Sequence, residues 1–89
     1  MKLKQLGPNM TELRFNGNYV LFSYETPVAG SNKDGVGKIV GRYHRLFKTE
    51  DEYSRTTTKH INKYFRDEWD VNPLSVQEVS QDYIDSLVS

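Results

Sequence analysis

The sequence contains no cysteine and no apolar run close to the length of a membrane span. Without cysteine, neither a disulfide framework nor a metal site with thiolate ligands can form. The first ten residues, MKLKQLGPNM, lack the apolar segment of a secretory signal peptide, and a transmembrane helix would need about 20 apolar residues. We therefore expect a single domain, residues 1–89, in a reducing cytoplasm and without a membrane partner.

Motifs for catalysis and cofactor binding are also lacking. The chain has no G-x-S-x-G element, no P-loop and no dinucleotide fingerprint. His44 and His60 are its only histidines, and the residue four positions after His60 is Tyr64 rather than a second ligand or a carboxylate. We expect no enzyme activity, no catalytic residue, no metal site and no cofactor. His60 is expected to bond the sheet or a backbone carbonyl, since imidazole readily serves as a structural partner.

Positive and negative charges are equal in number, 12 of each, but they are distributed unevenly. Residues 33–66 contain nine Lys or Arg against four Asp or Glu, whereas residues 67–89 contain six acids and no Lys or Arg. Such asymmetry suggests charged partners and says nothing about the fold. The acidic segment has two interpretations: it packs on the basic helix and neutralises it, or it stays outward as a negative surface.

The first third of the chain has the alternating pattern of β-strands. The runs KLKQL, TELRF and NYVLFSY are separated by GPN and NGN, and Asn16-Gly17 is typical of a two-residue hairpin turn. The alternation places one set of side chains on a common face: Leu3, Leu13, Phe15, Val20, Phe22 and Tyr24. Residues 26–37, with one proline and three glycines, are predicted to form a loop. Residues 38–49 are predicted to form a fourth strand.

From Thr56 or Thr57 the periodicity becomes helical, and a threonine is expected to cap the helix. The helix should end before Asn72-Pro73, because proline disfavours a helical residue before it. A short C-terminal helix follows, with Ser75 or Ser80 as its cap. The buried stripe of the first helix is predicted to contain Ile61, Tyr64, Phe65 and Glu68 or Trp69, and that of the second Val79, Tyr83, Ile84 and Leu87.

These patterns predict an α+β fold, in which a small antiparallel sheet of three or four strands packs against one amphipathic helix. The short C-terminal helix is expected at an edge of the sheet or beside the first helix. One face of the sheet should stay uncovered in so small a chain. Aromatic side chains exposed there would favour a homodimer or another partner.

The helix predicted over residues 56–67 also has a basic face. Its cations lie on a ridge opposite the apolar stripe, where they can neutralise phosphates, and neighbouring tyrosines, Tyr64 among them, can stack on bases. An exposed charged helix face is also common without any binding role. If the surface binds a partner, its candidate residues are Arg55, Lys59, Lys63, Arg66, Arg42, Arg45, Tyr43 and Tyr53.

Four segments together resemble a family of small uncharacterised proteins encoded by tailed bacteriophages. They are MKLKQLGPNMTEL, VLFSYETPVA, YSRTTTKHINKYF and VSQDYIDSLV, with FSYETPVA and TTTKHINKY the most specific pieces. The chain departs from the usual pattern at Tyr64, where tryptophan is common, and in a longer GSNKDGVGKIV insertion. The resemblance implies an accessory protein made in the cytoplasm of an infected bacterium, and it implies no functional residues.

Two classes of function are consistent with these observations. We expect a non-enzymatic inhibitor or adaptor that binds a host or phage protein complex through the exposed sheet or the acidic segment. The alternative is a nucleic-acid-binding module that uses the basic face of the helix over residues 56–67. Zero net charge weakens the alternative, because attraction to phosphate is largely electrostatic.

Overall fold

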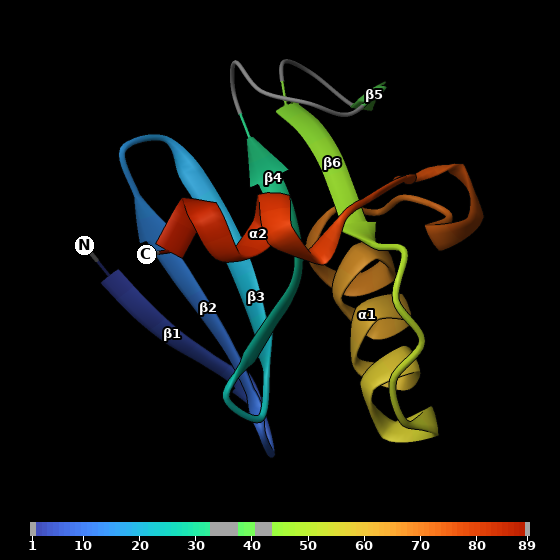
Figure 1. The fold of residues 1–89 in the computed structure, drawn as a ribbon. Helices are drawn as coiled ribbons and strands as arrows, with labels where there is room; N and C mark the ends of the chain where they lie inside the picture. The colour runs from blue at the N-terminus through green and yellow to red at the C-terminus, as the bar shows by residue number, and fades with distance from the viewer. Residues whose placement is uncertain (1, 33–37, 41–43, 89) are drawn as a thin grey trace.

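The computed structural model describes residues 2–32, 38–40 and 44–88 (Figure 1). Within these residues the fold is α+β, as predicted, and consists of one mixed seven-stranded sheet, two α-helices and one turn of 3₁₀-helix. The elements in chain order are β1 (Lys2–Gly7), β2 (Met10–Phe15), β3 (Asn18–Ser23), β4 (Thr26–Asn32), β5 (Lys38–Val40), β6 (His44–Thr49), α1 (Arg55–Glu68), η1 (Pro73–Ser75), β7 (Gln77–Val79) and α2 (Gln81–Val88).

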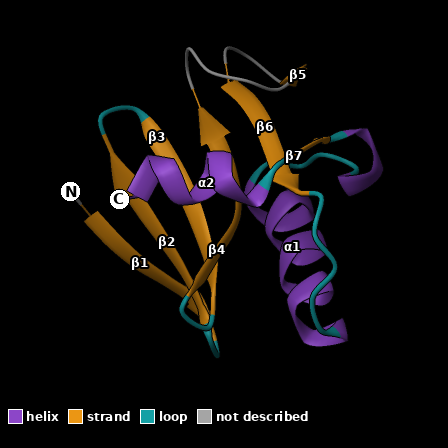
Figure 2. Cartoon of the chain, viewed as in Figure 1, coloured by secondary structure: helices purple, strands orange, loops and turns teal. Residues whose placement is uncertain are grey.

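The strands run in the order β1-β2-β3-β4-β6-β5, and each neighbouring pair is antiparallel (Figure 2). The short strand β7 pairs with β6 in parallel. The prediction of an antiparallel sheet of three or four strands is therefore wrong in strand number and in the direction of β7. The strand predicted over residues 38–49 is described as β5 and β6, with residues 41–43 outside the described part.

The hairpin between β2 and β3 has the turn that the sequence predicts. Asn16 and Gly17 both adopt positive φ, 48° and 79°, and Phe15 pairs with Asn18 across the two-residue turn. Positive φ at both central positions defines the turn type that matches the twist of the flanking strands. The Asn-Gly signal is thus confirmed.

Strand β4 occupies most of the segment that was predicted to be a loop, so that prediction is wrong. Pro27 is the second residue of the strand, beside a register shift in the β3–β4 pair, where the missing proline N–H is tolerated. Gly30 lets β3 and β4 approach closely, because a Cβ at this position would collide with the carbonyl oxygen of Tyr19. Residues 33–37 of the predicted loop lie outside the described residues.

Helix α1 begins one residue earlier than predicted, because Ser54 rather than a threonine caps it. The Ser54 hydroxyl accepts a hydrogen bond from the Thr57 backbone N–H at 3.2 Å, which satisfies one of the free amides of the first turn. The helix ends at Glu68, before Asn72-Pro73, as expected. Asn72 instead caps the 3₁₀ turn, with its side chain accepting from the Leu74 N–H.

The sheet has a hydrophobic core on each face. Leu21 packs with Ile61 and the other buried residues of α1, whereas the preceding strand residue, Val20, packs with Ile84 of α2. Successive strand residues point to opposite faces, so the two helices cover opposite faces of the sheet. In Figure 1, α2 crosses in front of the central strands. The expectations of an edge position for this helix and of an uncovered sheet face are therefore wrong.

The six side chains that were predicted to share a face do so with one exception. Leu3 pairs with Leu13 and Leu13 with Val20, which places them on the α2 side of the sheet. Leu3 is 72% exposed there. Tyr24 is the exception, since it follows β3 with a φ of 59° and contacts His60 of α1.

Candidate functional site

The exposed side of α1 carries a row of positive charge. We call the four exposed side chains Arg55, Lys59, Lys63 and Arg66 the cation ridge. The opposite side of the helix buries Thr57, Ile61, Tyr64 and Phe65 against the sheet. Within the described part of the chain, no ion pair involves a member of the ridge. The amphipathic pattern therefore holds the helix in place while four cations remain available to solvent.

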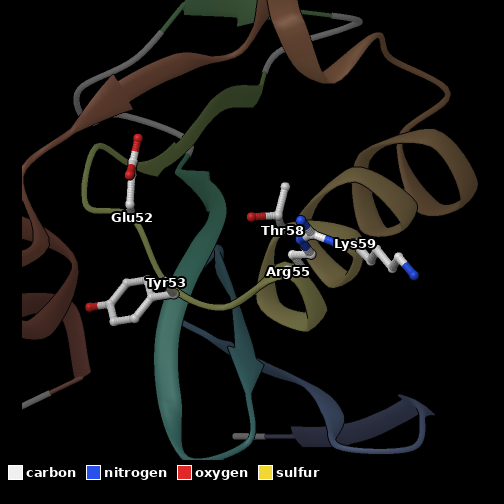
Figure 3. A pocket seen from close by; sticks show the side chains of 5 residues that line it. All are labelled: Glu52, Tyr53, Arg55, Thr58 and Lys59. Atoms are coloured by element: carbon white, nitrogen blue, oxygen red, sulfur yellow. The ribbon is translucent and has the colours of Figure 1, made fainter.

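A hollow with a volume of about 420 Å³ opens beside the first turns of α1. Figure 3 shows Arg55, Thr58 and Lys59 on the helix, with Glu52 and Tyr53 on the segment that leads into it. Tyr53 is 41% exposed. Burial and the nearby Asp51 and Asp85 carboxylates raise the pKa of its hydroxyl, so the ring is neutral at pH 7.

A second exposed tyrosine lies on the other flank of α1. The ring centroids of Tyr24 and His60 are 5.9 Å apart, and Tyr24 is 53% exposed. Its positive φ is uncommon for a bulky residue and is held by a hydrogen bond from the Tyr24 N–H to the Asn9 carbonyl at 2.8 Å. Tyr24 was not predicted as a site residue, because the alternation of β3 placed it on the opposite face of the sheet from α1.

A chain of hydroxyl groups runs from the cap of α1 to His60. Ser54 Oγ donates to Thr57 Oγ1 at 3.4 Å, Thr57 Oγ1 lies 3.0 Å from Ser23 Oγ, and Ser23 Oγ lies 2.7 Å from His60 Nδ1. Each hydroxyl can donate one hydrogen bond and accept others, so the contact with Ser23 occupies His60 Nδ1 in either neutral tautomer of the imidazole. His60 bonds the sheet, as expected, because Ser23 is the last residue of β3.

His60 is neutral at pH 7 for two physical reasons. Desolvation first, and the positive charge of Lys63 second, lower its pKa below the ordinary value of 6.5. A neutral imidazole can donate or accept at Nδ1, so the contact with Ser23 needs no charge on the ring.

A buried carboxylate anchors α1 to the sheet. Glu12 is 1% exposed and accepts hydrogen bonds from the Tyr64 hydroxyl at 2.7 Å and from Arg14 Nε at 2.6 Å. Burial, followed by the Glu12 charge, raises the pKa of Tyr64 well above 10, and the same carboxylate raises the pKa of Arg14. The prediction that Tyr64 stacks on bases is wrong, since its ring is buried. The sequence signal for Glu12 is its place between Met10 and Arg14 on the inward face of β2.

One of the predicted site residues, Arg45, lies away from the ridge. Arg42 and Tyr43 fall outside the described residues. Arg45 pairs with Asn32, and the Asn32 side chain bonds Tyr83 of α2 at 3.0 Å. Strand partners share a face, so Arg45 lies on the α2 side of the sheet.

In the described residues, no ion pair joins an acid of residues 67–89 to the cation ridge. Asp82 and Asp85 are exposed on α2, which packs on the opposite face of the sheet. Glu68 pairs at 3.5 Å with Lys4 of β1 rather than with a ridge cation. Asp82 and Asp85 of α2 therefore fit the second interpretation, in which the acidic segment stays outward as a negative surface.

Two kinds of feature are absent from the described residues. No group of three His, Asp or Glu side chains there is arranged to hold a metal ion. Likewise, none of the described helices has the length and apolar character needed to cross a membrane.

Comparison with known proteins places the chain in a family. Residues 1–85 match the model of a family of unknown function, DUF8033. The chain belongs to that family. No curated protein and no solved structure gives a significant match. The match to DUF8033 includes the cation ridge, Tyr24, Tyr53 and His60, so these side chains lie inside the segment that the family model covers.

Proposed function

We propose that this DUF8033 chain is a non-enzymatic binding protein that attaches to a macromolecular complex through the exposed side of α1. The cation ridge carries the proposal, because its four exposed charges have no ion-pair partner in the described residues. Tyr53 and Arg55 both line the adjoining hollow, and tyrosine and arginine are enriched among residues that dominate binding energy. The buried Glu12 network holds the helix that presents them.

The biological setting is part of the same proposal. The resemblance to small proteins of tailed bacteriophages supports an accessory protein that acts in the cytoplasm of an infected bacterium. Its partner would then be a host or phage complex. The chain would either inhibit this complex or act as an adaptor that recruits another component to it.

The non-enzymatic part of the proposal is supported by the environment of Ser23. Its contact with His60 resembles a nucleophile beside a base, but Ser23 is 2% exposed and also bonds Thr57. A nucleophile must reach its substrate, and its base is normally oriented by a third group. The hydroxyl chain is better explained as the link between the cap of α1 and β3.

Direct nucleic-acid binding by the same side of α1 is the second candidate. It is favoured by the position of α2, which packs on the opposite face of the sheet from α1, and in the described residues no acid of α2 pairs with a ridge cation. Zero net charge overall is then no obstacle to a locally positive surface.

Affinity purification of the tagged chain from bacterial cells tests the proposal. The ridge variant K59Q/K63Q/R66Q should lose the co-purifying complex. The matched control K2Q/K4Q/R45Q removes the same charge from the sheet and should retain that complex. Nuclease treatment before capture separates partners held by protein contacts from those held by nucleic acid. Equal recovery with wild-type, ridge and control chains would contradict the proposal.

A further inference from the structure

We propose that the cation ridge and the two exposed tyrosines beside it form a binding site for single-stranded nucleic acid. Tyr24 and Tyr53 would stack on unpaired bases, and the ridge would contact the phosphates between them. This inference rests on the proposed function in one respect, the use of the exposed side of α1 as the contact surface.

The two tyrosines lie on opposite flanks of the ridge. An α-helix turns once per 3.6 residues, so Thr58 and His60 project to either side of Lys59. Tyr24 contacts His60, and Tyr53 lines the hollow with Thr58. The cations of the first turns of α1 therefore lie between two exposed aromatic residues, which is the combination that sequence-tolerant single-strand binding requires.

The charge of the ridge complements a phosphate backbone. From Arg55 to Arg66 the ridge extends over about 16 Å, at 1.5 Å per residue, which is enough to meet several consecutive phosphates. The first turn of α1 contains no acidic residue, so the positive end of the helix dipole adds to the charge of Arg55 and Lys59. Each neutralised phosphate would contribute salt-dependent affinity.

The tyrosines favour a single strand over a duplex. Bases in a duplex are stacked on one another and offer no free faces, whereas unpaired bases can stack on aromatic side chains. Tyr24 and Tyr53 are two of the four large apolar side chains that are most exposed in the described residues, and both flank the ridge. A duplex would contact the cations, but its bases could not stack on the two tyrosine rings.

His60 adds a polar ring atom beside Tyr24. Its Nδ1 atom lies 2.7 Å from Ser23 Oγ, so Nε2 is the ring nitrogen left for a ligand. In the described residues no side chain hydrogen-bonds Nε2. The edge of a base carries both donors and acceptors, so a base stacked on Tyr24 could bond Nε2 in either tautomer, which gives the site a polar contact next to its stacking surface.

The test is fluorescence anisotropy with a labelled 20-nucleotide poly(dT) strand and a duplex of equal length, each at two salt concentrations. Wild-type protein should bind the single strand at least about 10-fold more tightly than the duplex. Tyr24→Ala and Tyr53→Ala should each weaken single-strand binding about 5-fold or more without changing the salt slope, because they remove stacking and no charge. The ridge variant K59Q/K63Q/R66Q should lower the salt slope by up to about 2, at about 0.7 per phosphate contact.

Tyr24→Asn provides a second variant at the position with positive φ, since asparagine tolerates this backbone conformation. It should weaken binding as Tyr24→Ala does while the thermal melting temperature stays at the wild-type value. The control K2Q/K4Q/R45Q should bind the single strand as tightly as wild type.

Three results would overturn the inference: no single-strand binding at low salt, equal affinity for the duplex, or unchanged affinity in the tyrosine variants. If the ridge variant still loses a captured protein complex in any of these cases, the proposed function stands and only the nucleic-acid ligand is wrong. If one of these three results is found and the ridge variant captures the same complex as wild type, both proposals fail.

Discussion

At the scale of single residues, the buried Glu12 carboxylate is the most consequential feature. Tyr64→Phe removes the hydroxyl that donates to it at 2.7 Å and leaves one acceptor without its partner. Loss of a hydrogen bond to a buried charge costs about 1–3 kcal/mol. We expect urea denaturation to show a loss of unfolding free energy in that range. Tyr53→Phe, at an exposed tyrosine, should leave the stability unchanged.

The same tyrosine makes the fold sensitive to alkaline pH. The pKa of Tyr64 is raised above 10 in the folded state, so above pH 10 the unfolded chain loses this proton while the folded chain retains it. Stability from this group is therefore complete below pH 10 and falls as pH rises further. Thermal melts between pH 8 and pH 11 should show a steeper decline for wild type than for Tyr64→Phe. Parallel declines would contradict the assignment.

His60 has the opposite dependence, on the acidic side. Its pKa is lowered below 6.5 in the folded state, so the unfolded chain takes up a proton first as pH falls. The contribution of His60 to stability is complete above pH 6.5 and is lost as pH falls from there toward the lowered folded pKa. Chemical denaturation at pH 7.5 and pH 5.5 should show a smaller loss of stability in His60→Gln. An equal loss in both chains would show that other groups cause it.

At the scale of elements, the cap of α1 offers a direct comparison between sequence and structure. The sequence predicted a threonine cap, whereas Ser54 performs this role. Ser54→Ala should destabilise the protein by about 1 kcal/mol, and Thr56→Ala, inside the helix and exposed, should be neutral or slightly stabilising because alanine favours helices. Guanidinium unfolding of both variants measures the two changes in unfolding free energy. The reverse order of stability would identify the threonine as the cap.

The elements that sequence predicts well are those with strong local signals. Strands β1 to β3, the Asn16-Gly17 turn and the helix before Asn72-Pro73 all follow from alternation, turn chemistry and helical period. Strand β4 was missed because Pro27 and Gly30 favour a loop locally. Their place in the sheet depends on a register shift and on a close approach to β3, and both are tertiary features.

The sequence also predicted one part of the candidate site and not the rest. The cation ridge follows from helical spacing alone, and its exposure agrees with that spacing. Tyr24 and the link from Ser23 to His60 could not be predicted, because they join β3 to α1 across 37 residues of sequence. The side of the sheet on which Arg45 lies could not be predicted, because the face of an isolated strand depends on its register with β4.

At the scale of the whole molecule, the sheet lies between the cation ridge and the acids of α2. The ridge lies on α1 and the acids Asp82 and Asp85 lie on α2, with the sheet between the two helices. The local sequence could not predict this arrangement, because both helices have an apolar stripe that could pack on either face. The separation depends on the path of the chain through η1 and β7, which carries it from one face of the sheet to the other.

The position of α2 leads to the last prediction, which concerns overall stability. Ile84 is fully buried against Val20 and Phe47 on the second face of the sheet. Ile84→Ala should therefore cost about 2–5 kcal/mol, a large part of the roughly 5–13 kcal/mol expected for a domain of this length. A helix at the edge of the sheet would contribute much less. Thermal and urea unfolding of Ile84→Ala beside Leu74→Ala, whose side chain is 87% exposed, measures the difference. Similar stabilities for the two variants would mean that α2 does not form the second core.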